Sequence, residues 1–257
     1  MNTSQVALVT GSGRRRLGWH VARALAARGY ALALQYRSSQ AEAEAAVAEF
    51  VASGVEAAAF HAELSEEADV RRLVDQTLAQ FSRIDVLVNC AAAWQSRPLE
   101  EVTADDVRGF WEANALSTFL MCQQVGLAMT RQSEGGSIIN FGDWAIVRPY
   151  LNYAAYFPSK GAIPALTRSL AVELGTRNPR VRVNCILPGP VMLPADLPAS
   201  EREQAIAGTL VKREGSPQHI ALAVLHFIDN DFLTGVCLPV DGGRSIYSPD
   251  SAGWWRE

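Results

Sequence analysis

Short apolar runs rich in β-branched residues alternate along this chain with longer segments in which apolar residues recur at helical spacing. Seven such runs predict strands: QVALVTG (5–11), YALALQY (30–36), 55–64, IDVLVN (84–89), GSIINFG (136–142), VRVNCIL (181–187) and VCLPV (236–240). Helical patterns fill the intervals, over 17–28, 40–52, 65–81, 103–130, 156–174 and from 217 onward. The alternation predicts an α/β protein, a single-domain, doubly wound parallel sheet of Rossmann type that spans 1–257.

Two segments depart from this alternation. Residues 190–215 are rich in Pro, Ala, Ser and Glu, which predicts a substrate flap with one short helix. A tail over 244–257 carries two adjacent tryptophans, Trp254 and Trp255. Because two exposed indoles are unusual on a solvated tail, we expect them to pack on their own subunit or across an oligomer interface.

The net charge, the cysteines and the histidines indicate which partners and ligands are not expected. A net charge of -4 argues against a nucleic-acid partner, which would need a concentrated basic face. The four cysteines form no CxxC pair and the four histidines show no ligand spacing, so we expect no metal site. The first residues show no signal peptide and no membrane span follows, so we expect a cytoplasmic protein with no membrane partner.

The first predicted strand runs into the turn TGSGRRRLG, where a phosphate site is expected because ligands of such sheets bind beyond the carboxyl ends of the strands. Gly11, Gly13 and Gly18 would let the backbone approach a pyrophosphate, and the following helix would offer its N–H groups. A purely structural turn is the alternative.

The end of the second predicted strand indicates which dinucleotide is preferred. An NAD site usually has an acid here, but this chain has Tyr36, Arg37, Ser38 and Ser39. An arginine beside two hydroxyls suits a 2′-phosphate, so we expect NADP(H). The alternative is an exposed loop arginine.

Tyr156 and Lys160 lie four residues apart, so in a helix both project from one face. A cation beside a phenol favours the phenolate and lowers the pKa toward a range useful for proton transfer. An ordinary surface pair on a helix is the alternative reading of this spacing alone.

Together, the pieces TGSGRRRLG, NCAA (89–92), Asn114, the YxxxK pattern at 156–160, PGPV (188–191) and VDGG (240–243) resemble the short-chain dehydrogenase/reductase family over nearly the whole chain. The resemblance implies an NAD(P)-dependent oxidoreductase, a strand order of 3-2-1-4-5-6-7 and usually a homotetramer or dimer. It implies that Tyr156 is the proton donor, that Lys160 binds the nicotinamide ribose and lowers the tyrosine pKa, and that Asn114 supports a relay water. The expected cofactor residues are Gly11, Gly13, Arg15, Arg16, Leu17, Gly18, Tyr36, Arg37, Ser38, Ser39, Glu63, Leu64, Asn89, Ala91, Tyr156, Lys160, Pro188, Gly189 and Val191.

One position departs from the family pattern. Most members have a serine thirteen residues before the tyrosine, whereas this chain has Asp143. An ionised Asp can only accept hydrogen bonds, so the site would favour a substrate with N–H donors, or burial would keep the acid protonated.

That substitution resembles the pteridine reductase branch of the family, as do Arg16, Trp94 and Tyr153. A pterin is planar and rich in N–H donors, which suits an aromatic lid opposite the nicotinamide and a carboxylate at its edge. The expected substrate residues are Arg16, Trp94, Asp143, Tyr150, Tyr153 and Tyr156. Structural alternatives are a core or interface role for Trp94 and a helix-capping or salt-bridged role for Asp143.

We therefore predict an NADPH-dependent reductase of a pterin, dihydropterin or dihydrofolate. The alternative is a carbonyl reductase for ketones or 3-oxoacyl groups. A third possibility is a regulator that binds NADPH without turnover, against which the intact set of Tyr156, Lys160 and Asn114 argues.

Overall fold

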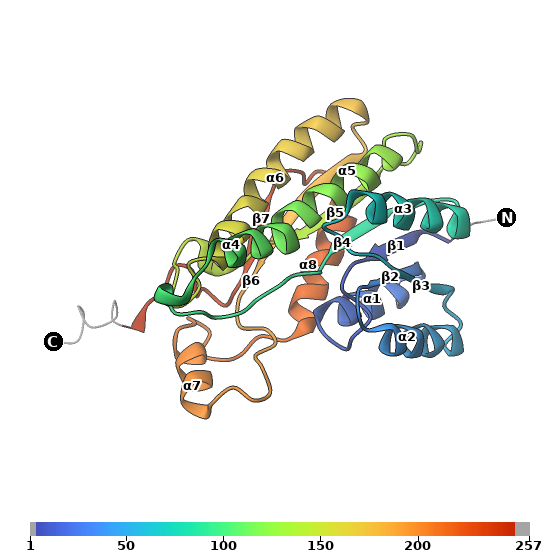
Figure 1. Ribbon diagram of the computed structural model, residues 1–257. Coiled ribbons are helices and arrows are strands. Elements are labelled where there is room, and N and C mark those ends of the chain that lie inside the picture. The colour runs from blue at the N-terminus through green and yellow to red at the C-terminus, as the bar shows by residue number, and fades with distance from the viewer. Residues whose placement is uncertain (1–3, 250–257) are drawn as a thin grey trace.

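A seven-stranded parallel sheet forms the centre of the chain in the computed structural model, which describes residues 4–249 (Figure 1). Its order is β3-β2-β1-β4-β5-β6-β7, which confirms the expected fold and order. The strands are β1 (Val6–Val9), β2 (Ala31–Tyr36), β3 (Ala57–His61), β4 (Val86–Asn89), β5 (Gly136–Phe141), β6 (Val181–Pro188) and β7 (Cys237–Val240).

Eight α-helices connect or flank these strands in the described part of the chain. They are α1 (Leu17–Ala26), α2 (Gln40–Ala52), α3 (Glu67–Phe81), α4 (Ala104–Phe110), α5 (Ser117–Met129), α6 (Tyr156–Arg177), α7 (Ala199–Ala207) and α8 (Pro217–Asp229). None of the helices in residues 4–249 combines the length and apolar character that crossing a bilayer requires.

The core lies in two layers, one on each face of the sheet. α3, α5 and α6 pack on one face, and α1, α2 and α8 pack on the other (Figure 1). Because both faces are covered, β1 and β4 are buried along their whole length. The strand order reverses between β1 and β4, and this is where such sheets bind ligands.

Local sequence signals set several helix ends. Thr103 caps α4 in a capping box with Asp106, whose carboxylate accepts the Thr103 backbone N–H at 2.8 Å. Ser216 and Pro217 begin α8 as expected. Gly29 follows α1 with φ +84°, a left-handed conformation that favours glycine.

The long helix expected over 103–130 is interrupted. Between α4 and α5 the chain forms a π-helical segment, η2 (Trp111–Leu116), which contains Asn114. Hydrophobic spacing does not distinguish this widened turn from an α-helix, so the sequence prediction missed it.

The segment 190–215, for which a flap is predicted, contains one short helix, α7, which stands apart from the helical layers (Figure 1). The tail is described as far as Pro249. The prediction for Trp254 and Trp255 lies outside the described residues.

Candidate active site

A cleft of about 940 Å³ opens at the carboxyl ends of the strands. The turns after β1, β2, β3, β4, β5 and β6 line it, together with the start of α6 and the flap. The sheet thus brings together segments from residue 11 to residue 244 at its switch point.

The glycine-rich turn forms one end of this cleft. Gly11 and Gly18 line it, and Gly11 has φ +61°. A Cβ on Gly18 would lie 2.9 Å from the carbonyl oxygen of Gly11, so α1 can pack on the turn only through a glycine. Gly13 lies outside the lining, where a Cβ would come within 2.8 Å of Ser39 Oγ, so its small size serves packing.

The three arginines of this turn point in different directions. Arg14 and Arg16 line the cleft. Arg15, expected at the cofactor, instead pairs with Glu49 at 2.7 Å and lies over the Trp19 ring, outside the lining. The structure therefore places Arg14, rather than Arg15, in the cleft lining, where Arg14 also pairs with Glu42 at 3.4 Å.

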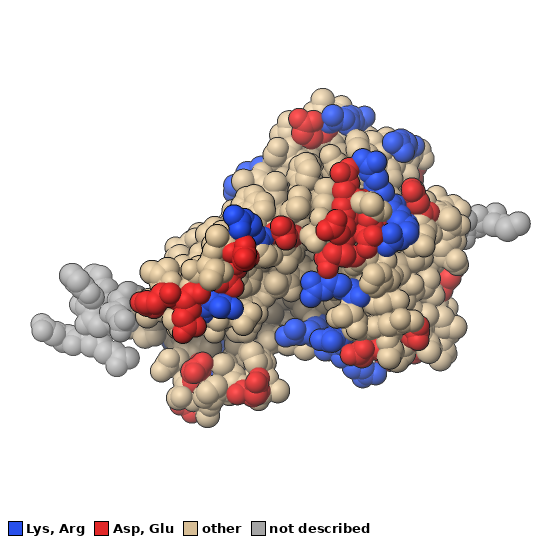
Figure 2. Space-filling model, in the orientation of Figure 1, with Lys and Arg blue, Asp and Glu red and all other residues tan. Residues whose placement is uncertain are grey.

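The end of β2 carries the residues expected at a 2′-phosphate. Tyr36, Arg37, Ser38 and Ser39 all line the cleft, as do Glu63 and Leu64 after β3. Arg37 lies 3.5 Å from Glu63 and remains largely exposed. Basic side chains gather beside the hollow at the centre of the face in Figure 2. This donor set fits a phosphorylated dinucleotide.

The turns after β4 and β6 complete the cofactor half. Ala91 lines the cleft and its N–H donates to Thr10 Oγ1 at 3.0 Å, which ties the two central turns together. Pro188, Gly189 and Val191 also line the cleft. Asn89 lies behind it, buried, and donates to Asn140 Oδ1 at 2.9 Å, so the structure gives it a supporting position.

The reactive groups meet where β5 ends and α6 begins. Tyr156 donates its phenolic O–H to Asp143 Oδ2 at 2.8 Å. The other carboxylate oxygen of Asp143 accepts the Ala145 N–H at 2.8 Å and caps the turn η3 (Trp144–Ile146). Lys160 is buried and donates from Nζ to the Phe141 carbonyl at 2.9 Å. Asp143 therefore fulfils the capping role and also contacts Tyr156, the predicted proton donor.

The electrostatics differ from the sequence expectation for Tyr156. Burial, then the negative charge of Asp143 and its hydrogen bond, raise the pKa of Tyr156 far above its ordinary value. Lys160, which was expected to lower this pKa, donates to the Phe141 carbonyl and is not among the groups that shift the pKa of Tyr156 here, so its tuning role stays a prediction. Burial also raises the pKa of Asp143 and lowers the pKa of Lys160.

Comparison with known proteins identifies this architecture. The sequence profile of the family described as Enoyl-(Acyl carrier protein) reductase matches residues 12–245. The chain belongs to the short-chain dehydrogenase/reductase family. It is accordingly an NAD(P)-dependent oxidoreductase in its general activity.

Individual members of the short-chain dehydrogenase/reductase family resemble the chain to similar degrees. A 3-oxoacyl-[acyl-carrier-protein] reductase from Synechocystis is 33% identical, covering 95% of this chain and 98% of the relative. Pteridine reductase 1 from Leishmania tarentolae is 32% identical, covering 95% and 97%. A blue fluorescent protein from a metagenomic library, solved in complex with NADPH, is 35% identical with a TM-score of 0.85, covering 95% and 99%.

Asn114, expected to support the relay of this dehydrogenase/reductase, lies fully buried in η2 and outside the cleft lining. Its side chain accepts the Ala93 N–H at 2.9 Å and donates to the Ala93 carbonyl at 3.1 Å and to Ser159 Oγ at 3.0 Å. It thus ties the turn after β4 to α6, and its contact with a relay water stays a prediction.

The predicted substrate residues form an aromatic wall of the same cleft. Trp94 is 49% exposed and stacks on Tyr153, with ring centroids 5.3 Å apart. Tyr153 contacts Tyr156 edge to face at 6.0 Å and Tyr150 at 4.9 Å. Burial raises the pKa of Tyr150 to about 12, so its phenol stays neutral.

The sequence reasoning missed several residues that line this site, Arg14 among them. Trp144 and Arg244 line the substrate end, and Gln35 lines the cofactor end. Buried Gln35 accepts the Gly11 N–H and donates to the Ala62 carbonyl, both at 2.8 Å. A polar residue inside the apolar run ALALQY was the available signal for Gln35.

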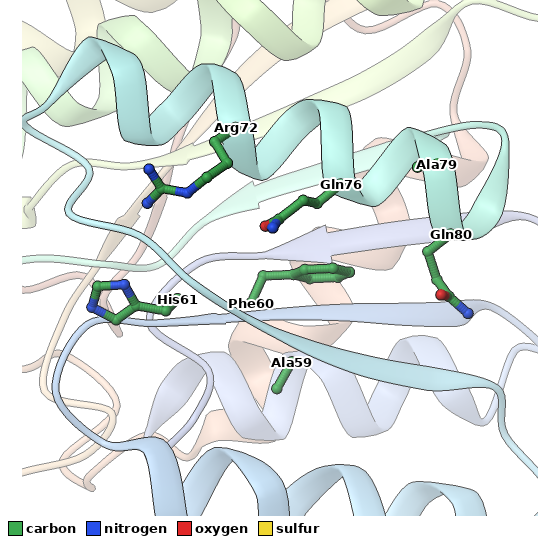
Figure 3. A pocket seen from close by; sticks show the side chains of 7 residues that line it. All are labelled: Ala59, Phe60, His61, Arg72, Gln76, Ala79 and Gln80. Atoms are coloured by element: carbon green, nitrogen blue, oxygen red, sulfur yellow. The ribbon is translucent and has the colours of Figure 1, made fainter.

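A second hollow, of about 500 Å³, lies between β3 and α3 (Figure 3). Its lining includes His61 and Arg72, but Arg72 pairs with Asp69 at 2.8 Å. None of the residues expected at cofactor or substrate lines this hollow.

Proposed function

We propose that this chain uses NADPH to reduce a planar heterocycle of the pterin type, such as a dihydropterin or dihydrofolate. The observation that carries the proposal is the hydrogen bond between Tyr156 and Asp143, at the position where most family members have a serine. The likeness to pteridine reductase 1 agrees with it.

The preference for NADPH over NADH is inferred from the residues at the end of β2. Arg37 with Ser38 and Ser39 faces the cleft without an acid among them, and Arg14 and Arg16 add positive charge. These groups would hold the additional phosphate of NADPH by charge-assisted hydrogen bonds. The NADPH complex of the structural relative supports the same preference. When bound, NADPH supplies the hydride that reduces a C=N bond.

Asp143 has two tasks in this proposal. Its negative charge keeps the proton on Tyr156, so the phenol is protonated before the reductive step. Each carboxylate oxygen has a second lone pair, so Asp143 can also accept an N–H of the heterocycle.

The aromatic wall positions the ring. One face of Trp94 stacks on Tyr153, and half of the Trp94 surface remains exposed at the cleft. A flat heterocycle seated beside this wall would bury apolar area without leaving its N–H groups unpaired. Tyr156 would then deliver its proton to a ring nitrogen.

A carbonyl reductase is the second candidate. The 3-oxoacyl reductase is as similar to the chain as the pteridine reductase. Burial raises the pKa of Asp143, and the protonated acid can donate to a ketone oxygen as a serine would.

The test is NADPH oxidation with dihydrobiopterin and dihydrofolate beside simple ketones and a 3-oxoacyl thioester. We expect turnover of the pterins and its loss in Tyr156→Phe by about 10²-fold or more. Turnover of ketones alone would overturn the pterin proposal. Tight NADPH binding without any turnover would favour a regulator.

We also propose, from the family resemblance, that the chain forms a homotetramer in the cytoplasm. Light scattering of the purified full chain tests the assembly, and a monomer would contradict it.

A further inference from the structure

Arg244 follows the glycine pair in the turn after β7 and lines the substrate end of the cleft. Its guanidinium lies over the Trp144 ring, 4.7 Å from the centroid. Trp144 is the neighbour of Asp143 in the chain, so this cation stands beside the loop that carries the reactive carboxylate.

Three contacts hold Arg244 in place. Besides the stacking on Trp144, Nη1 donates to the Ala205 carbonyl in the last turn of α7. The Arg244 backbone carbonyl accepts from Arg148 at 3.0 Å. The side chain therefore bridges the flap and the Asp143 loop with little freedom to move away.

No carboxylate among residues 4–249 forms a direct ion pair with Arg244, and the charge of Asp241 attracts it only from a greater distance. Asp241, three residues earlier, uses its oxygens to accept the N–H groups of Gly243 and Ser245 at 2.9 and 2.7 Å. A partly buried guanidinium without an anionic partner loses hydration and gains no ion pair, so an anion brought by a ligand would be stabilised there.

A row of aromatic rings connects Arg244 with the proton donor. Trp144 stacks on Tyr150 at 6.1 Å, and Tyr150 meets Tyr153, which meets Tyr156. A substrate lying along this row would present its reacting bond to Tyr156 at one end and reach Arg244 at the other.

Two acids also line this part of the cleft and would oppose an anion. Asp143 is bonded to Tyr156 and lies at the reacting end. Glu201 raises the pKa of Tyr153, which places its charge nearer to that ring. The charges of Asp143 and Glu201 leave the Trp144 end as the position where a negative group is favoured.

We propose that Arg244 recognises a carboxylate carried by the substrate at a position remote from the bond that is reduced. The inference rests on the proposed function only in placing a substrate in this cleft. Recognition by Arg244 would favour substrates that carry a carboxylate in either candidate class. These are a dihydrofolate among the pterins and an oxo acid among the ketones. Arg244 is a specificity residue and takes no part in proton transfer.

The test compares substrates that differ in the carboxylate. The pairs are dihydrofolate with dihydrobiopterin, and 4-acetylbenzoate with its neutral isostere 4-acetylbenzamide. We expect Arg244→Gln to raise KM for the acids by about tenfold, with little change for the neutral partners and in kcat. Arg244→Lys keeps the charge and should retain part of the preference. High salt should weaken acid binding in the wild type and not in Arg244→Gln.

Arg213→Gln is the matched control, because Arg213 is exposed on the same flap and lies outside the cleft lining. If Arg244→Gln raised KM equally for the acids and for their neutral partners, Arg244 would only support the flap, and the inference would be overturned. Fluorescence titration of the NADP⁺ complex with the four compounds gives a binding readout without turnover. If ketones but not pterins react, the pterin proposal fails while the 4-acetylbenzoate pair still tests Arg244.

Discussion

Asp143 contacts both the backbone of its own loop and the side chain of Tyr156. One carboxylate oxygen caps η3 and the other accepts from Tyr156. The same carboxylate therefore holds the loop after β5 and accepts the phenolic hydrogen bond of Tyr156. Burial disfavours the charged form of Asp143 and raises its pKa. Because this pKa then differs between the folded and unfolded states, the ionisation of Asp143 can be measured through the pH dependence of stability.

Asp143→Asn should change how stability depends on pH. The pKa of Asp143 is raised in the folded state, so between the ordinary Asp value of about 3.9 and the raised value the folded chain binds more protons than the unfolded chain. Stability contributed by this group is present below pH 3.9 and is lost as pH rises through the raised pKa. The unfolding free energy of wild type relative to Asp143→Asn should therefore fall across that window and then level off. Thermal and urea unfolding from pH 4 to 8 measure it, and a constant difference would contradict the raised pKa.

Asp143→Ser should move substrate preference from pterins toward ketones. The hydroxyl donates to a carbonyl oxygen but provides a weaker partner for ring N–H groups, so we expect about a tenfold fall in kcat/KM for dihydrobiopterin relative to a ketone. The NADPH dissociation constant serves as the control for an intact cofactor half. If Asp143→Ser keeps full pterin activity, the carboxylate is not a substrate contact.

At the scale of elements, the π-helical segment η2 carries a structural link between two turns. The wider turn presents Asn114 to the Ala93 backbone and to Ser159 on α6. Because Ala93 precedes Trp94, this link sets the position of the aromatic wall as well as the start of α6.

Asn114→Ala should destabilise the fold by about 2 to 4 kcal/mol, because it leaves the partly buried backbone groups of Ala93 and the buried hydroxyl of Ser159 without these hydrogen bonds. Ser159→Ala is the matched comparison, since it removes one of these bonds and should cost less. Urea unfolding measures both variants. Equal costs would show that the two bonds to Ala93 add little.

Two helical glycines should respond in opposite directions to alanine. A Cβ on Gly126 in α5 would overlap Leu174 of α6, so Gly126→Ala should cost about 1 to 3 kcal/mol despite the better helix propensity of alanine. Gly109 in α4 has open space, and Gly109→Ala should stabilise by up to about 1 kcal/mol. Urea unfolding compares them, and stabilisation in both would contradict the close packing of α5 on α6.

At the scale of the whole molecule, the cofactor cleft joins turns from most of the chain, so a dinucleotide should stabilise the entire fold. NADPH at about 100 times its dissociation constant should add about 2.7 kcal/mol, or roughly 5 to 10 °C in Tm. NADH at the same concentration should add less, and Arg37→Asp should reduce the difference, while Arg213→Asp should not. Equal stabilisation of the wild type by NADPH and NADH would contradict the role given to Arg37.

Much of the fold could be predicted because its determinants are local and periodic. The apolar runs gave the seven strands, and the strand order agreed with the family resemblance. Thr103 and Ser216 marked helix starts through hydrogen bonds and backbone angles that depend on adjacent residues alone. The π-helical turn was missed because it depends on contacts of Asn114 with distant segments.

The sequence by itself determined the sheet, and it predicted the cofactor turn and a reactive set of Asp143, Tyr156 and Lys160. Only the tertiary structure decided which way each side chain points and which charges meet. It turned Arg15 away from the cleft, bonded Lys160 to a carbonyl, raised the pKa of Tyr156 and placed Arg244 at the substrate end. Burial and contacts between residues far apart in the chain set these properties. The periodic pattern of apolar residues in the sequence does not predict such contacts.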